Sequence, residues 1–462
     1  MAMQYVDCTV TIKDEEYVGI EYFCDGSKCS TPRGKLGGDT FSKLVVERLN
    51  HWINFALKYQ EDHPGTPNPC QVTDLQVIGL NLYRILFGNS EEGIGKDFAS
   101  AYSDFEKKRA ETGAIDMRFR LRMIFEPPAK ELGNLPWEFL FIPGEEDEND
   151  LDRGFFFAGE KTELILTRCV PESKIIRDML SQQPPKLERL RILVVVSSPK
   201  GDGLTTPIDE KETATVLDQI EKIKGADIGS SLKDPTLNDL SRAIKERTPH
   251  IVHFIGHGRE GELALVKSPD EDDYDESIPD VPQTRWITSK VFRNLFSLPK
   301  PRLIFLHACK GAVATSQEGF SSIARELAYA EIPAVVAMQY NISNRDAGKF
   351  ARRFYEELAN GRDIDEAVKE GRLELGQVYP QWAHPRFGTP VVYLQTNYPI
   401  VLPSNEEQKA PEETPPEDLN RGLARPGGSV AAVVNLPLEP SAQQRATASP
   451  AEPAKAGTGV EG

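Results

Sequence analysis

The fold is decided by two stretches, HIVHFIGHG at residues 250–258 and LIFLHACKGA at residues 303–312. Each has a short apolar run, typical of a strand buried on both faces, and each ends in a reactive side chain with glycine within two residues. In open α/β sheets, functional groups gather where parallel strands end, at the carboxyl edge. Two adjacent parallel strands here would bring His257 and Cys309 within reach of each other.

Outward from these stretches, apolar runs alternate with amphipathic helical segments. Further strands are expected at Leu190–Val196, Ala334–Met338 and Pro390–Leu394, with helices at about Asp209–Lys222 and Leu237–Glu246. Nearer the N-terminus, the expected strands are Thr9–Ile12, Tyr17–Tyr22, Phe119–Phe125 and Thr162–Thr167, and the expected helices are Phe41–Tyr59 and Lys96–Glu111. This alternation indicates βαβ units, so we expect an α/β fold with a mainly parallel sheet flanked by helices.

Composition excludes several classes of protein. The chain has 462 residues, and its 54 Lys and Arg against 71 Asp and Glu give a formal net charge of −17. An acidic chain without a basic patch repels phosphate backbones, so no nucleic-acid partner is expected. No apolar run approaches the roughly 18 residues of a membrane span, and the start does not resemble a secretory signal. Six cysteines in so long a chain do not form a disulfide framework, which favours free thiols in the cytoplasm.

His257 and Cys309 are the pair that cysteine nucleophilic catalysis needs. A thiol with a pKa of ~8.5 is mostly protonated at neutral pH. A nearby imidazole takes that proton during attack and then protonates the leaving amine. The backbone amides of Gly258 and Cys309 are expected to face the developing oxyanion, since glycine permits close approach.

The same stretches resemble the CHAT domain family, caspase-like cysteine peptidase domains of clan CD that are related to separase and the caspases. The resemblance is carried by VHFIGHG at 252–258 and FLHACKG at 305–311, and it extends to residues 335–361 and 382–394. LGNLPWEFLF at 132–141 resembles a leucine-proline-tryptophan-glutamate element in the family's non-catalytic half.

The resemblance implies a function as well as a fold. His257 is then the base, Cys309 the nucleophile, and Gly258 with Cys309 the oxyanion hole. The implied activity is regulated, limited proteolysis of a protein substrate, switched on by an activating protein or complex, within a bacterial defence or stress system. Neither a metal nor an organic cofactor is implied.

Resemblance and composition together predict four parts of the chain. Prolines 184 and 185 indicate a linker at Gln182–Lys186, because neither fits inside a helix. From Pro403 onward there are nine prolines and no aromatic residue, which predicts a disordered tail. We expect an unassigned α/β region at 1–114, the non-catalytic N-terminal half of the CHAT-like region at 115–183, the catalytic domain at 187–400 and the tail at 403–462.

Two further residues are candidates for substrate binding. His307 stands where the family more often has serine, and it could contact the substrate, tune Cys309 or be a hydrogen-bonded turn residue. Asp346 could read a basic side chain, or it could cap a helix that Asn344 or Asp346 opens and that runs to Asn360. The acidic segment Asp270–Asp280 would favour basic substrates if it borders the cleft.

Three other classes of function compete with the peptidase. The main alternative is a catalytically silent CHAT-fold interaction or scaffold module, which has the same sequence pattern. A metallohydrolase using His253, His257 and His307 is disfavoured, because the first two would lie about 13 Å apart along a strand. A Rossmann-type nucleotide binder lacks its glycine-rich turn after Val196.

Overall fold

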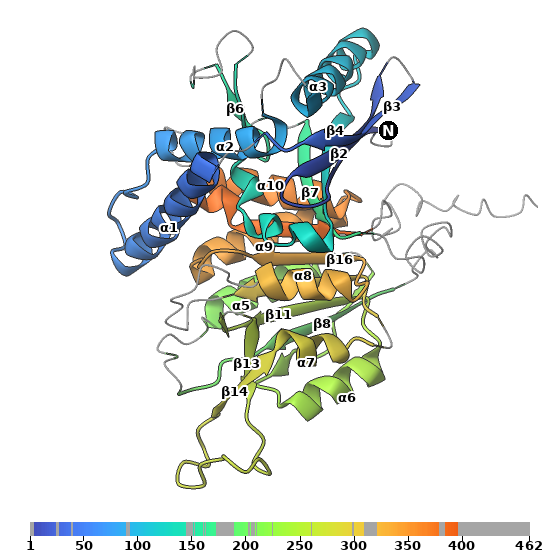
Figure 1. Ribbon diagram of the computed structural model, residues 1–462. Coiled ribbons are helices and arrows are strands. Elements are labelled where there is room, and N and C mark those ends of the chain that lie inside the picture. Colours follow the sequence, from blue (N-terminus) through green and yellow to red (C-terminus); the bar gives the residue numbers. More distant parts are fainter. Residues whose placement is uncertain are drawn as a thin grey trace, which may run out of the picture. The chain divides into compact units, whose positions relative to one another are not determined.

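The computed structural model describes most of the chain up to residue 395 (Figure 1). The described residues are 4–24, 27–37, 40–88, 93–144, 151, 153–159, 161, 163–171, 189–201, 204, 208, 210–223, 225–259, 261–297, 300–308, 321–377 and 384–395. The linker predicted at Gln182–Lys186, the tail predicted at 403–462 and Cys309 all lie outside these residues.

A 12-stranded sheet organises the described part of the chain, in the order β10-β8-β11-β15-β16-β17-β7-β4-β1-β2-β3, with β9 paired to β8. The strands of its C-terminal half are β8 (Leu190–Val196), β9 (Ala226–Asp227), β10 (Leu232–Lys233), β11 (Ile251–Gly256), β15 (Leu303–Ala308), β16 (Ala334–Met338) and β17 (Pro390–Leu394). All neighbours in this half are parallel except β16 and β17. The predicted mainly parallel sheet is therefore confirmed.

The N-terminal strands continue this sheet. They are β1 (Gln4–Ile12), β2 (Tyr17–Cys24), β3 (Ser27–Lys35), β4 (Met117–Phe125) and β7 (Leu164–Cys169). β7 pairs in parallel with β17 through Tyr393 and Arg168, and β4 and β1 follow in parallel. β2 and β3 close this edge as antiparallel strands. One sheet thus runs through both of the expected folded regions.

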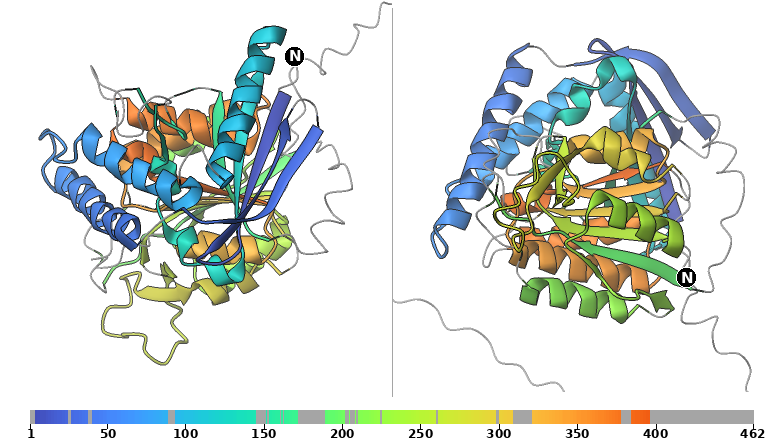
Figure 2. Two further views of the ribbon diagram at one scale, coloured as in Figure 1. Left: turned by 45° about the horizontal axis from the view of Figure 1, so that its top comes forward. Right: turned by 90° about the horizontal axis from the view of Figure 1, so that it is seen from below.

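Helices cover both faces of the C-terminal half, as the right view of Figure 2 shows. One face packs against α5 (Glu210–Glu221), α9 (Asn344–Ala359) and α10 (Ile364–Gly376), and the other against α6 (Leu237–Arg247), α7 (Ser289–Asn294) and α8 (Ser321–Tyr329). Side chains alternate between the two faces along a strand, so Ile255 and Phe305 meet α9 whereas Phe254 and Leu306 meet the other layer. The apolar runs of these strands are thereby explained, because both faces are buried.

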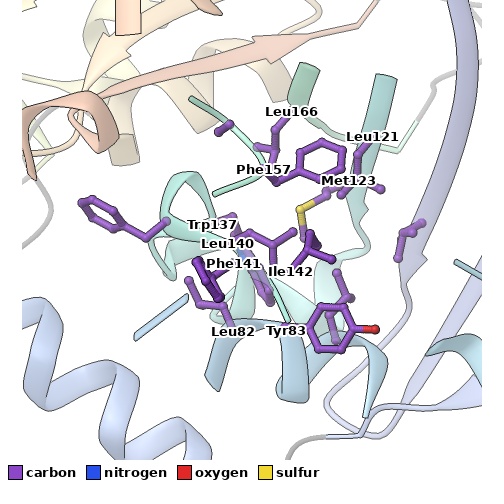
Figure 3. Close-up of a cluster of buried hydrophobic side chains, with 14 of the residues drawn as sticks. Leu82, Tyr83, Leu121, Met123, Trp137, Leu140, Phe141, Ile142, Phe157 and Leu166 are labelled. Carbon is purple, nitrogen blue, oxygen red and sulfur yellow. The ribbon is translucent and has the colours of Figure 1, made fainter. Parts of the chain in front are cut away.

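A second core lies against the N-terminal strands. It is formed by α1 (Thr40–Asp62), α2 (Val72–Phe87), α3 (Gly93–Thr112), the short turns η1 (Pro127–Ala129), η2 (Leu132–Asn134) and η3 (Trp137–Phe139), and strands β5 (Phe141–Ile142) and β6 (Phe155–Phe156). Figure 3 shows Trp137, Leu140 and Phe141 lying between α2 and β4. The turn η4 (Pro385–Gly388) packs on this core through Phe387, which contacts Phe139.

A small antiparallel sheet follows β11. Its strands are β12 (Gly258–Arg259), β13 (Glu262–Val266) and β14 (Thr284–Thr288). Among the described helices, none is both long and apolar enough to cross a lipid bilayer.

Candidate active site

The ends of β11 and β15 build the candidate site. These strands are parallel neighbours, and their last paired residues are Gly256 and Ala308. In the sequence, β11 is followed by His257 and β15 is followed by Cys309. The expected adjacency of the two strands is confirmed, while Cys309 itself lies beyond the described residues.

His257 occupies the single residue between β11 and β12, and its side chain is buried. Its carbonyl accepts a hydrogen bond from the Ala264 amide at 2.9 Å, while Gly258 pairs with Leu263. The hairpin of β12 and β13 therefore fixes the backbone on both sides of the imidazole. Gly256 is needed for space, since a Cβ there would overlap the ring of Phe254.

A buried chain of three polar side chains leads to the end of β15. Tyr355 Oη, on α9, lies 2.7 Å from His253 Nδ1, and His253 Nε2 lies 3.4 Å from His307 Nδ1. All three groups come from the face of the sheet that α9 covers, and each is at most 2% exposed. His307 Nε2 is buried without a hydrogen-bond partner among the described residues. His307 is therefore a fixed, interior side chain two residues before Cys309.

Burial keeps these rings neutral. Desolvation lowers the pKa of His307 to about 4 and holds the pKa of His253 well below its ordinary value, with the neighbouring His307 adding to the second effect. Desolvation also raises the pKa of the Tyr355 hydroxyl. At neutral pH each imidazole thus carries one ring proton.

Asp346 lies in the first turn of α9, where its carboxylate contacts three side chains of the protein itself. The helix begins at Asn344 and has Asn360 as its C-cap, as expected, but its N-cap is Ser343, whose hydroxyl accepts from the Asp346 amide at 3.1 Å. Asp346 Oδ2 accepts from Ser343 Oγ at 2.8 Å and pairs with Arg386 Nε at 3.0 Å, and Lys349 lies 3.6 Å from the other oxygen. These contacts favour a structural role for this carboxylate.

The acidic segment Asp270–Asp280 forms the loop between β13 and β14. The hairpin pairs Gly258 with Leu263 near His257, but the loop leaves it at the opposite end, after the pair Val266 and Thr284. Two of its acids pair with neighbouring bases, Asp273 with Lys267 at 2.9 Å and Glu271 with Arg285 at 2.7 Å. The loop is therefore displaced along the hairpin from the candidate site.

A buried ion pair beside the site was missed by sequence reasoning. Glu138, the acid of the LPWE element, pairs with Arg168 of β7, and both side chains are inaccessible to solvent. Gln339, the residue after β16, donates to Glu138 Oε2 at 2.8 Å, and Arg372 of α10 lies 3.5 Å from Oε1. An arginine inside the apolar run LILTRC was the available signal, because a buried charge requires a partner.

No group of three or more His, Cys, Asp or Glu side chains that could hold a metal ion occurs within the described residues. Cys8, Cys29, Cys70 and Cys169 are free thiols. Burial raises the pKa of the Cys70 thiol to about 12 and also raises that of Cys169, so neither resembles an activated nucleophile.

Comparison with known families agrees with this geometry. The family model of the CHAT domain matches residues 104–387, which is more than half of the chain. The protein belongs to the CHAT domain family. The match begins before the predicted boundary at residue 115 and contains both strand ends of the candidate site, and the expected α/β fold with a mainly parallel sheet is confirmed.

Two of the solved structures similar to this CHAT protein share little sequence identity with it. The Saccharomyces cerevisiae separase–securin complex is 16% identical with a TM-score of 0.35, and the match covers 78% of this chain but only 22% of the separase chain. The Arg-specific cysteine proteinase gingipain R is 13% identical with a TM-score of 0.38, and the match covers 77% of this chain and 76% of that one. No match was found among curated protein sequences.

Proposed function

We propose that this CHAT protein is a cysteine endopeptidase that uses Cys309 as its nucleophile and His257 as its base. The observation that supports this most is the pairing of β11 with β15, whose register ends at Gly256 and Ala308. The next residues in the sequence are the histidine and the cysteine, so this register supports a dyad at one edge of the sheet.

The proposed reaction has two stages. His257 takes the thiol proton, the Cys309 sulfur bonds to the peptide carbonyl carbon, and the carbonyl π electrons move to oxygen. The tetrahedral adduct collapses with release of the amine, which His257 protonates, and leaves an acyl-enzyme. Water then attacks the thioester with His257 as base, and the carboxylic acid and the thiol are regenerated.

The proposed oxyanion hole consists of the backbone amides of Gly258 and Cys309. The hairpin that holds Gly258 is paired on both sides of His257, which gives this amide a fixed position. Pre-positioned donors of this kind stabilise the charge that develops on the carbonyl oxygen.

We further propose that the substrate is a protein, that a partner protein or complex activates the enzyme, and that it acts in the cytoplasm in bacterial defence or stress. These parts rest on the family resemblance and on the composition of the chain. We do not propose a preference for basic residues, because Asp346 already pairs with Arg386 and the acidic loop leaves the far end of its hairpin.

The test is a census of new protein N-termini in lysate of the source cells, in which the natural activator is present. The wild-type protein is compared with Cys309→Ala and His257→Ala, and Cys29→Ala serves as a matched control because that free thiol lies on β3. We expect new termini with the wild type and with Cys29→Ala only. If all four proteins give the same termini, the scaffold reading replaces the peptidase.

A further inference from the structure

Three basic side chains lie side by side at the amino edge of the sheet. They are Arg191 of β8, His250, which directly precedes β11, and Arg302, which directly precedes β15. The His250 amide donates to the Arg191 carbonyl at 2.8 Å, and the Arg302 amide donates to the His250 carbonyl at 2.7 Å. At about 3.3 Å per residue, this basic row lies roughly 23 Å along β11 from His257, so it is separate from the candidate active site.

The side chains of the basic row share one face of the sheet. The residues one position further along the three strands lie in the core that α9 covers; they are Ile192, Ile251 and Leu303. Because side chains alternate, the basic row faces the other helical layer, which contains α6. Desolvation lowers the pKa of His250 to about 4, and the positive charges of Arg191 and Arg302 add to this effect. The imidazole is therefore neutral at pH 7, between two cations.

Each member of the basic row keeps hydrogen-bond donors for a ligand. His250 Nδ1 accepts from the Arg191 amide at 3.1 Å, so the proton of the neutral ring lies on Nε2. Arg191 Nε donates to the carbonyls of Arg247 and Thr248 at 3.1 and 2.9 Å, which leaves its two terminal nitrogens. Arg302 Nη1 is buried without a hydrogen-bond partner in the part of the chain that the structure describes. A buried guanidinium donor of this kind requires an acceptor, which an anion would supply.

A cavity of about 450 Å³ adjoins the basic row at Arg191. It lies between β8, the segment that follows β9 and the end of α6. The Arg247 guanidinium in its lining already donates to the Ser230 carbonyl at 2.7 Å. Asp227 and Glu246, also in the lining, are exposed carboxylates that accept hydrogen bonds from hydroxyl groups. The volume lies in the range of small-molecule sites.

We propose that the basic row binds the phosphate group of a small phosphate monoester, whose hydroxylated organic part occupies the adjoining cavity. Guanidinium groups match phosphate oxygens in charge and geometry, and His250 adds a neutral Nε2–H donor. Asp227 and Glu246 accept from the hydroxyl groups of the ligand. Sugar phosphates and nucleotides share this chemistry. The site goes beyond the proposed peptidase activity and does not depend on it.

Isothermal titration calorimetry of the full chain at neutral pH and low ionic strength tests the proposal. The probes are inorganic phosphate, ribose 5-phosphate, AMP and ribose. We expect ribose 5-phosphate to bind about tenfold more tightly than inorganic phosphate, because only the ester also fills the cavity, and ribose not to bind. Tighter binding of AMP than of ribose 5-phosphate assigns the site to a nucleotide, and equal or weaker binding assigns it to a sugar phosphate.

Three variants test which residues hold the phosphate. Arg302→Gln removes a positive charge and should weaken binding of ribose 5-phosphate about tenfold or more. His250→Asn keeps an acceptor for the Arg191 amide but removes the Nε2 donor, and should also weaken binding. Arg242→Gln is the matched control, because it removes an exposed positive charge on α6 that pairs with Asp239, and the affinity should not change. Thermal unfolding without ligand shows which variants are folded, and His250→Asn decides if Arg302→Gln is not.

The outcomes separate this site from the proposed function. The proposal is overturned if neither inorganic phosphate nor its esters bind the wild-type protein. It is also overturned if Arg242→Gln weakens binding as much as Arg302→Gln or His250→Asn, since the effect is then one of net charge. Equal affinities for inorganic phosphate and ribose 5-phosphate overturn the role of the cavity and support a site for free phosphate. The census of N-termini tests the peptidase independently of all these results.

Discussion

At the scale of single residues, Glu138 is a buried carboxylate that contacts three polar side chains, Arg168, Gln339 and Arg372. Arg168 binds both of its oxygens, and the same guanidinium also donates to the carbonyls of Gly133 and Leu135. Gln339 joins this network to the end of β16, one strand away from β15. The LPWE element thus anchors the sheet edge that carries the candidate site.

Glu138→Gln should destabilise the protein strongly, because it leaves the buried Arg168 guanidinium without its paired carboxylate and removes an acid that lies 3.5 Å from Arg372. Breaking a buried ion pair by removing one partner costs about 3–5 kcal/mol. Equilibrium denaturation in urea measures the change in the free energy of unfolding. The exposed pair Asp218–Lys222 is the control, since Asp218→Asn should change stability by less than about 1 kcal/mol. A small loss in Glu138→Gln would show that the network is not needed for stability.

At the scale of helices and strands, the sequence predicts best what is buried on both faces. Leu190–Val196, Ala334–Met338 and Pro390–Leu394 are strands with the predicted bounds, because continuous apolar runs have few other uses in an α/β protein. β3 was missed because its sequence, SKCSTPRGK, is polar and mostly exposed at the edge of the sheet. α2 was also missed, because every residue from Ile78 to Phe87 except Arg84 is buried, so no exposed polar face marks this part of the helix.

Strand order could not be predicted from these local patterns. The run PVVYL has the same apolar character whatever its neighbours, yet β17 pairs antiparallel with β16 and parallel with β7. The candidate site was easier to predict from the sequence, because His257 and Cys309 each follow an apolar run and have a glycine nearby. The contact between His253 and Tyr355 could not be predicted, since it joins residues 102 positions apart.

At the scale of the whole molecule, buried histidines make stability depend on pH. Desolvation lowers the pKa of His384 to about 3 and that of His307 to about 4, against about 6.5 in an unfolded chain. Below pH 6.5 the unfolded state therefore binds protons that the folded state does not. Stability is fully present above pH 6.5 and falls as the pH is lowered, by about 1.4 kcal/mol per pH unit for each such imidazole.

Urea midpoints between pH 7 and pH 5.5 test this dependence. His384→Asn keeps an acceptor for the Arg386 amide, which His384 Nδ1 accepts at 3.2 Å, but removes one titrating group. Its stability should therefore fall less steeply with decreasing pH than that of the wild type, and comparing the two slopes cancels the other groups. If stability falls equally steeply with pH in both proteins, the pKa of His384 is not lowered in the folded state.

The central claim is that β11 and β15 bring His257 and Cys309 together as a catalytic pair. The most direct measurement is covalent labelling in source-cell lysate with peptidyl acyloxymethyl ketones that carry Arg, Asp or Leu next to the electrophile, followed by mass spectrometry of every cysteine peptide. The account predicts an adduct on Cys309 with at least one probe, lost in His257→Ala, while Cys29 stays unlabelled. Labelling of Cys309 no faster than that of Cys29, and unchanged in His257→Ala, would contradict it.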